Sequence, residues 1–224
     1  MYKYAIIVAG GAGIRMGGDV PKQFQLLKGK PVLWHTLKAF TDAYDDVQMI
    51  LVLPENYMDT GETIAKEFPL HRIRITTGGA TRFHSVKNGL RLVDTHAIVF
   101  VHDAVRCLVS PQLIRRCAEA ALEKDNAIPS VAAVDTIRIQ TASGNEGIER
   151  NRVRILQTPQ TFFSNIIKAA FEQPYQESFT DEASVVERTG VKINLIEGEA
   201  NNIKITKPVD WLIAERILED REIS

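Results

Sequence analysis

The sequence has few of the features that mark several large protein classes. Its 224 residues include only two cysteines, Cys107 and Cys117, at a spacing that fits no metal site. No apolar stretch approaches the roughly 20 residues of a membrane helix, and Lys3 precedes a strand-length run where a signal peptide would have a longer one. The net charge of −1 argues against a broad nucleic-acid surface. We therefore expect a reduced, cytoplasmic protein with neither a membrane nor a nucleic-acid partner.

Apolar runs alternate with segments of helical period along the chain. The runs rich in β-branched residues lie at 4–8, 47–53, 73–76, 97–101, 127–134 and 193–196. Helical spacing of apolar residues follows at 32–40, 113–121 and 213–217, and Ser110-Pro111 is a typical helix start. Strands that are apolar on both faces and alternate with helices are typical of parallel sheets. We predict one α/β domain over residues 1–224, with a Rossmann-like, mostly parallel sheet flanked by helices.

Residues 135–154 interrupt this pattern. The stretch "DTIRIQTASGNEGIERNRVR" has short alternating segments around Ser143-Gly144-Asn145, many charges and little to bury. It predicts a two-stranded β-arm that leaves the body of the domain. Because an isolated hairpin is marginally stable in water, we expect the arm to pack on a second subunit. A solvated loop folded on its own domain is the alternative.

A glycine-rich loop follows the first apolar run. The stretch "VAGGAGIRMGGDVPKQF" starts at Val8, and such a loop after a buried strand suits a phosphate. It is no Walker A loop, because Gly-Lys-Ser/Thr is absent, and Met16 stands where a dinucleotide fingerprint needs its third glycine. What remains is a glycine loop with its own cations, Arg15 and Lys22. Fixed positive charge of this kind suits a reaction that builds negative charge on phosphoryl oxygens.

Later stretches add candidate groups. Asp103 ends a buried strand, where a carboxylate can hold a Mg²⁺ ion that bridges phosphates, although such an aspartate also often caps a turn. Gly78-Gly79 precede a helix start, where backbone groups are placed to bind a base. His102 has a simpler interpretation as a satisfied buried imidazole, and both cysteines as small core residues.

Six motifs in order give these groups a common meaning. The glycine loop with R-M-G, then P-K-Q-F, H-D-A-x-R, Q-T-P-Q, T-D-E-A-S and N-I-K-I-T span nearly the whole chain. This order resembles the 2-C-methyl-D-erythritol 4-phosphate cytidylyltransferases of the non-mevalonate isoprenoid pathway. The resemblance implies a nucleotide-diphospho-sugar-transferase-like fold and homodimers whose arms interlock. It implies that a phosphate oxygen of methylerythritol phosphate attacks the α-phosphorus of CTP, so that pyrophosphate leaves.

The resemblance also implies roles for single residues. The cations on the triphosphate match Arg15, Lys22 and Lys204. The CTP-binding positions match Ala9, Gly10, Gly11, Gly13, Gly79, Arg82, Ser85 and Asp103, and Asp103 also matches the metal-binding aspartate. The positions around methylerythritol phosphate match Arg106, Thr136, Arg150, Thr158 and Thr180, of which Thr136 and Arg150 lie on the predicted arm.

Three positions depart from the family pattern. Ala80 and Asn201 stand where relatives often have an acid, and Cys107 replaces a usual proline. A ribitol-5-phosphate cytidylyltransferase shares several of the motifs and is the alternative within the same chemistry; the segment from Thr180 to Ser184 favours methylerythritol. A catalytically silent nucleotide-binding regulator is the alternative from another class. The many cations gathered for one phosphate group argue against it.

Overall fold

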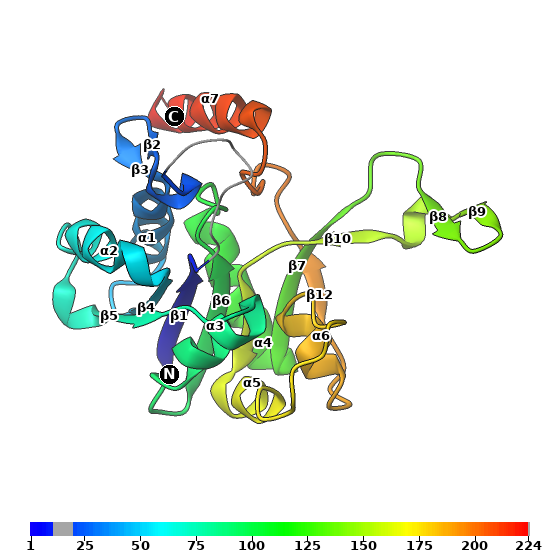
Figure 1. Cartoon of the computed structure of the whole chain (residues 1–224), viewed down its shortest axis with the longest axis horizontal. Helices are drawn as coiled ribbons and strands as arrows, with labels where there is room; N and C mark the ends of the chain where they lie inside the picture. The colour runs from blue at the N-terminus through cyan, green and yellow to red at the C-terminus, as the bar shows by residue number, and fades with distance from the viewer. Residues whose placement is uncertain (11–19, 224) are drawn as a thin grey trace.

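The structure, a computed structural model, describes residues 1–10 and 20–223 (Figure 1). Its centre is an eight-stranded sheet whose order is β10-β7-β11-β6-β1-β4-β5, with β12 paired to β7. The strands are β1 (Tyr2–Val8), β4 (Gln48–Leu53), β5 (Ile73–Thr77), β6 (Ala97–Asp103), β7 (Asn126–Ala132), β10 (Arg154–Leu156), β11 (Gln160–Phe163) and β12 (Leu195–Glu197). A small hairpin of β2 (Leu26–Leu27) and β3 (Lys30–Pro31) lies apart from this sheet.

The predicted mostly parallel sheet is confirmed. β1 pairs in parallel with β4 and β6, and β4 pairs in parallel with β5. β11 runs antiparallel between β6 and β7, and β10 is antiparallel to β7. All six predicted strands are present, whereas β10 and β11 were not predicted. The carboxyl ends of β1, β4, β5 and β6 therefore meet at one edge, where ligands bind in open α/β sheets.

Helices cover both faces of the sheet. The core on one face takes its helical side chains from α1, α2 and α4, and the core on the other face takes them from α3, α5 and α6. The helices are α1 (Val32–Ala43), α2 (Met58–Ala65), α3 (Arg82–Leu90), α4 (Pro111–Lys124), α5 (Ser164–Ala170), α6 (Glu182–Glu187) and α7 (Pro208–Ile223). The predicted start of α4 is confirmed, because the Ser110 hydroxyl accepts the Leu113 N–H at 3.0 Å. α7 covers a smaller third cluster that contains Leu27 and Ile205.

The alternation of side chains along β1 explains the two cores. Ala5 and Ile7 point to one face, and Tyr4 and Ile6 to the other, as the period of a strand requires. α3 lies unusually close to the sheet, because a Cβ on Gly89 would approach the Ile6 side chain to 2.7 Å. This close packing brings the first turn of α3 to the carboxyl edge of the sheet.

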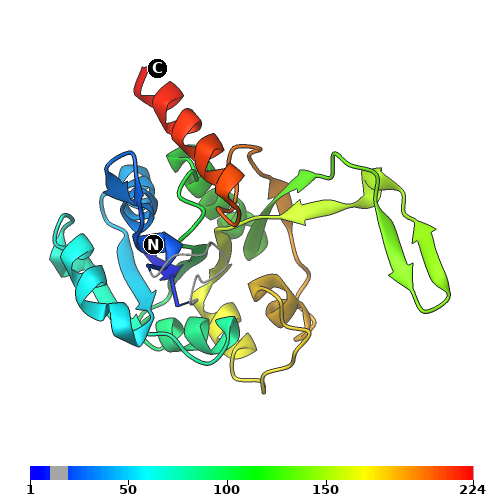
Figure 2. The same ribbon diagram turned by 45° about the horizontal axis from the view of Figure 1, so that its top comes forward.

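The predicted β-arm is a hairpin of β8 (Arg138–Thr141) and β9 (Gly144–Gly147). Figure 2 shows it extending away from the body of the domain. Its turn differs from the prediction by one position: Ala142 and Ser143 form a two-residue loop, and Gly144 already pairs with Thr141. Gly144 has φ +139, a conformation that glycine adopts without strain.

Within the described residues, the helices are too short or too polar to cross a bilayer.

Candidate active site

Two glycine turns meet at the carboxyl edge of the sheet. Ala9 N donates to Val52 O at 2.9 Å, and Gly78 N donates to Leu53 O at 2.8 Å, so the chain after β1 lies beside the chain after β5. A Cβ on Gly10 would lie 3.4 Å from Gly78 Cα, which is tighter than ordinary packing allows for most residues. The backbones of the two turns therefore lie against each other at the carboxyl edge of the sheet.

The Ser85 hydroxyl organises the second of these turns. Its Oγ accepts the Gly79 N–H at 3.0 Å and donates to Thr81 O at 3.0 Å. Thr81 in turn caps α3 by accepting the His84 N–H. The predicted base-binding residues Gly79 and Ser85 are thus brought together, with Ser85 holding the turn in place.

Asp103, the last residue of β6, is surrounded by cations. Its Oδ1 accepts a hydrogen bond from Arg82 Nη1 at 2.6 Å, and its Oδ2 lies 2.9 Å from Lys204 Nζ. Arg106 Nε lies 3.6 Å from the same Oδ2. Burial raises the pKa of Asp103, but Arg82 and Lys204 lower it by more, so its pKa lies well below the ordinary value. Asp103 is therefore a carboxylate throughout the physiological range.

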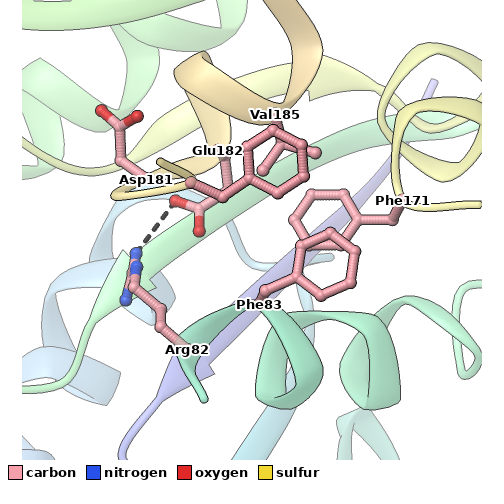
Figure 3. A pocket seen from close by; sticks show the side chains of 7 residues that line it. Arg82, Phe83, Phe171, Asp181, Glu182 and Val185 are labelled. Carbon is pink, nitrogen blue, oxygen red and sulfur yellow. Dashed lines mark hydrogen bonds and ion pairs between the residues drawn. The ribbon is translucent and has the colours of Figure 1, made fainter. Parts of the chain in front are cut away.

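Arg82 bridges this carboxylate to a second one. Figure 3 shows its guanidinium directed at Glu182, the first residue of α6, with Nη2 2.9 Å from Glu182 Oε2. Glu182 is almost fully buried, and its burial raises its pKa although Arg82 lowers it. Burial lowers the pKa of Arg82, but Asp103 and Glu182 raise it by more, so the guanidinium stays charged. A small pocket beside this bridge is lined by Phe83, Phe171, Phe179 and Val185.

Thr158 ties the neighbouring loop to Asp103. Its Oγ1 accepts the Asp103 N–H at 3.1 Å and lies 3.0 Å from His102 Nδ1. His102 Nε2 lies 3.1 Å from Arg106 O, an acceptor only, so Nε2 carries the proton and Thr158 donates to Nδ1. Burial lowers the pKa of His102 to about 3. The interpretation of His102 as a satisfied, neutral, buried imidazole is confirmed.

Lys22 and Lys204 come from different segments, the turn that precedes β2 and the loop between β12 and α7. Lys22, in the short 3₁₀ turn Lys22–Phe24, is buried and donates from Nζ to Ile205 O at 2.8 Å. Its neighbour Gln23 donates to Ala9 O at 2.8 Å, which ties this turn to the end of β1. The predicted cations Lys22 and Lys204 therefore flank one stretch of backbone, beside the glycine turn.

Arg106 is held by backbone carbonyls. Its Nη1 donates to Asn202 O at 2.9 Å, while its buried Nε has no hydrogen-bond partner. Thr180 precedes α6, is exposed, and donates its backbone N–H to Ser184 Oγ at 3.2 Å. Arg106 and Thr158 thus lie together around Asp103, and Thr180 lies two residues from Glu182.

Two of the predicted site residues do not join this cluster, and three others are not among the described residues. Gly11, Gly13 and Arg15 lie outside the described residues. Thr136 and Arg150 belong to the arm, which Figures 1 and 2 show extending away from the body of the same chain. Arg150 donates to Val134 O at 2.9 Å, at the base of the arm.

Some residues of the site were not predicted. Glu182 belongs to the T-D-E-A-S motif, for which only Thr180 was given a role, although a charged residue beside a helix cap was a usable signal. Gln157, Gln160 and Asn202 are buried polar residues that contact the same loops. The described residues contain no group of three or more His, Cys, Asp or Glu side chains able to hold a metal ion.

A parallel sheet with glycine turns at its carboxyl edge, and with lysines and arginines around one buried aspartate, defines a nucleotidyltransferase. The family model for 2-C-methyl-D-erythritol 4-phosphate cytidylyltransferase matches residues 3–220. A relative of that name from Bacteroides fragilis is 46% identical over 220 residues, covering 97% of this chain and 100% of its own length. A relative from Porphyromonas gingivalis is 42% identical, over 96% of this chain and 97% of its own.

Solved structures show the same fold. The 4-diphosphocytidyl-2C-methyl-D-erythritol synthase of Anaerococcus prevotii superposes with a TM-score of 0.85 at 28% identity, covering 97% of this chain and 96% of its own. The Thermus thermophilus cytidylyltransferase gives 0.78 at 29% identity, covering 98% and 100%. The chain belongs to the 2-C-methyl-D-erythritol 4-phosphate cytidylyltransferases, which make 4-diphosphocytidyl-2-C-methyl-D-erythritol from CTP, as the motifs predicted.

The bridge made by Arg82 yields a stability prediction. Arg82→Ala leaves Glu182 and Asp103 buried without their shared cation, so the free energy of unfolding should fall by about 3 kcal/mol. Arg74→Ala, which removes an exposed pair with Asp94, is the matched control and should cost under about 1 kcal/mol. Urea unfolding at neutral pH measures both.

A second substitution identifies the cause of the loss. Adding Glu182→Gln to Arg82→Ala removes one of the unpaired carboxylates and should restore part of the lost free energy. A double variant no more stable than Arg82→Ala contradicts this account of the bridge.

Proposed function

We propose that CMP is transferred by direct in-line attack of a methylerythritol phosphate oxygen on the α-phosphorus of CTP, with pyrophosphate as the leaving group. The incoming phosphate is already an anion, so the step needs no general base. Nucleophilic side chains close to the site are unsuited to a covalent route: His102 is neutral with both ring nitrogens engaged, and burial raises the pKa of Cys107 to about 12. Catalysis then consists of positioning and charge stabilisation.

The observation that supports this proposal most strongly is the convergence of cations at one edge of the sheet. Lys204 lies against Asp103, and Lys22 reaches the backbone of the next residue, Ile205. In this proposal, Lys22, Lys204 and Arg15 of the glycine loop stabilise the charge that grows on the triphosphate. Such stabilisation raises the rate when it is stronger in the transition state than in bound CTP.

The nucleotide is proposed to lie along the glycine turns. Ala9 and Gly10 follow β1, and Gly79 precedes α3, where the Ser85 hydroxyl holds its N–H. Arg82 and Ser85, in the first turn of α3, hold this wall of the site. The remaining proposed contacts are Gly11 and Gly13 of the glycine loop.

The acceptor is proposed to lie on the other side of Asp103. Arg106, Thr158 and Thr180 come from the loops after β6, before β11 and before α6. Arg106 Nε, buried and without a hydrogen bond, is a donor suited to a phosphate oxygen. Thr136 and Arg150 complete the pocket in this proposal, and they come from the arm.

Mg²⁺ is the proposed cofactor, and the donor chemistry of Asp103 fits it. Oδ1 of Asp103 is hydrogen-bonded to Arg82, and Oδ2 contacts Lys204 at 2.9 Å with Arg106 farther away at 3.6 Å, so each oxygen retains a lone pair. Magnesium is commonly bound by one or two carboxylates together with substrate phosphates and water. Asp103 would hold the ion, which when bound neutralises phosphate charge.

We propose a homodimer in which each arm reaches the partner's active site. Two features support it: the arm pairs only with itself among the described strands, and exposed apolar side chains lie on it and at its base, Ile139 and Val134. Contact with a second subunit would bury those side chains. The reducing cytoplasm is the proposed compartment, supported by two buried free cysteines.

The choice of acceptor is tested by a direct assay. With CTP and Mg²⁺, the protein should release pyrophosphate in the presence of 2-C-methyl-D-erythritol 4-phosphate and far more slowly with ribitol 5-phosphate. A reaction without either acceptor is the blank. Equal or faster release with ribitol 5-phosphate contradicts the acceptor assignment, and no release with either supports a silent nucleotide binder.

The metal assignment is tested at Asp103. Asp103→Asn removes an anionic oxygen that a hard cation prefers, so the apparent affinity for Mg²⁺ should fall by at least about tenfold. Magnesium titration of pyrophosphate release measures this, with the exposed Asp46→Asn as control. Because Asp103→Asn also leaves cations unpaired, circular dichroism must confirm folding at the assay temperature. A titration curve identical to that of the wild type argues against the assignment.

Arm exchange is tested by subunit mixing. If Lys22 of one chain and Arg150 of the other share a site, then Lys22→Ala and Arg150→Ala homodimers should both be nearly inactive. A hybrid of the two carries both lesions in one site and leaves the other site intact. Random exchange at equal amounts makes about half of the dimers hybrids, so activity should recover to about a quarter of the wild-type value.

The control is differential tagging, which confirms that subunits have exchanged. If Arg150 serves its own chain, every site in every hybrid carries one lesion. Exchange without recovery would thus overturn the shared site while leaving the roles of Lys22 and Arg150 unaffected.

A further inference from the structure

Gln157 holds the loop that precedes Lys204. Its side-chain Nε2 donates to Glu199 O at 2.8 Å, and its Oε1 accepts the Glu199 N–H at 3.1 Å. The carboxamide thus pairs with one residue's backbone in both directions, as a neighbouring strand would. Gly198 allows this contact, because a Cβ there would lie 2.4 Å from Gln157 Oε1.

The same loop carries a second anchor before Lys204. Asn202 is completely buried and donates from Nδ2 to Thr158 O at 2.8 Å. Lys204 follows two residues later, and its side chain is 45% exposed. A half-exposed lysine has little side-chain packing to fix it, so the place of its ammonium on Asp103 depends on the backbone that these two amides hold.

Gln160 holds a different loop by the same kind of contact. Its Nε2 donates to Asp181 Oδ2 at 2.8 Å, and its Oε1 accepts the Ala183 N–H at 2.8 Å. The two partners flank Glu182, the residue that binds Arg82 (Figure 3). Gln160 therefore fixes the first turn of α6, which sets Glu182 against the guanidinium.

The two glutamines are three residues apart, and Thr158 between them accepts the Asp103 N–H. The segment 157–160 thus contacts Asp103, the loop that carries Lys204, and the loop whose Glu182 binds Arg82. We propose that Gln157 and Gln160 are positioning residues with separate targets: Gln157 sets Lys204, and Gln160 sets Arg82 through Glu182. This proposal rests on the proposed roles of Lys204 in the transition state and of Arg82 in CTP binding.

A purely structural role makes a different prediction. Both glutamines are buried and hydrogen-bonded, and such residues often only satisfy nearby backbone groups. In that case their loss lowers stability and activity together, with no difference between the two positions. Separate targets require that one variant act on turnover and the other on CTP binding.

The test replaces each carboxamide by an apolar side chain of similar length. Gln157→Met should lower kcat by roughly ten- to a hundredfold, the range for a small misplacement of a catalytic group, with little change in the KM for CTP. Gln160→Met should mainly raise the KM for CTP. Asn126→Leu is the matched control, because the buried Asn126 carboxamide donates to Lys192 O and accepts the Asn194 N–H at the start of β7, and it should change neither constant more than about twofold.

A double-variant comparison identifies the target. In a Lys204→Ala background, assayed in single turnover with enzyme in excess, Gln157→Met should cause no further loss, whereas Gln160→Met should keep its effect. If Gln157→Met lowers the rate as much in this background as in the wild type, the positioning role is refuted. The proposal is also refuted if both variants lower kcat and raise the KM for CTP to the same extent. If a methionine variant does not fold, Gln157→Glu or Gln160→Glu is used in its place. A glutamate keeps the accepting Oε1 and loses the donating Nε2.

Failure of the proposed function is visible separately. The wild-type protein is assayed first with CTP and methylerythritol phosphate, and its turnover does not depend on either glutamine variant. Wild-type turnover combined with unchanged constants in both methionine variants rejects the positioning roles alone.

Discussion

The buried carboxylate of Asp103 is the interaction on which the rest of the site depends. It stands at the end of a fully buried strand and is shared by Arg82 and Lys204, with Arg106 close by. These cations repel one another and face low-dielectric surroundings, so they need a fixed anion to stay together. Glu182 gives Arg82 a second anion. A site prepared for a triphosphate thus contains its own negative charge.

The balance between these cations and carboxylates requires that the surrounding loops hold each charged side chain in place. A cation that moves by an ångström loses much of its interaction with both the carboxylate and a substrate phosphate, because short ion pairs depend steeply on distance in a low dielectric. Apolar residues such as Ile205 and Ala183 anchor the segments that carry Lys204 and Glu182. Buried amides add to that packing: Gln157 and Asn202 on one side, and Gln160 on the other.

The sequence predicted the fold well, because the main strands are apolar on both faces. Continuous apolar runs such as 97–101 are typical of strands that are buried on both faces of a sheet. A glycine turn and a strand-end charge then placed Gly79 and Asp103 at the same edge, whereas the role of Lys204 came from the resemblance alone. The ordered motifs identified the family, which no single spacing did, and the family model and the relatives confirm it.

Other features left little trace in the sequence. β11 has four residues and lies antiparallel, and α6 has six, so each is too short for a repeating apolar pattern to be recognised. The roles of Gln157 and Gln160 depend on backbone groups of Glu199 and Ala183, and a backbone contact has no residue type to reveal it. The arm turn moved by one position because Ser143 and Gly144 both suit a turn.

The insertion of β11 between β6 and β7 has a consequence for the order of folding. β6 pairs with β11 through contacts such as Val101 with Gln160, so one edge of a fully buried strand stays open until some sixty further residues are available. During synthesis, residues 1–103 therefore present an unpaired apolar strand edge, a surface prone to aggregation. Residues that complete the surroundings of Asp103 come later still, at 182 and 204. The nucleotide site is consequently completed late, because the amino-terminal half contains Gly79, Arg82 and Asp103 but neither Glu182 nor Lys204.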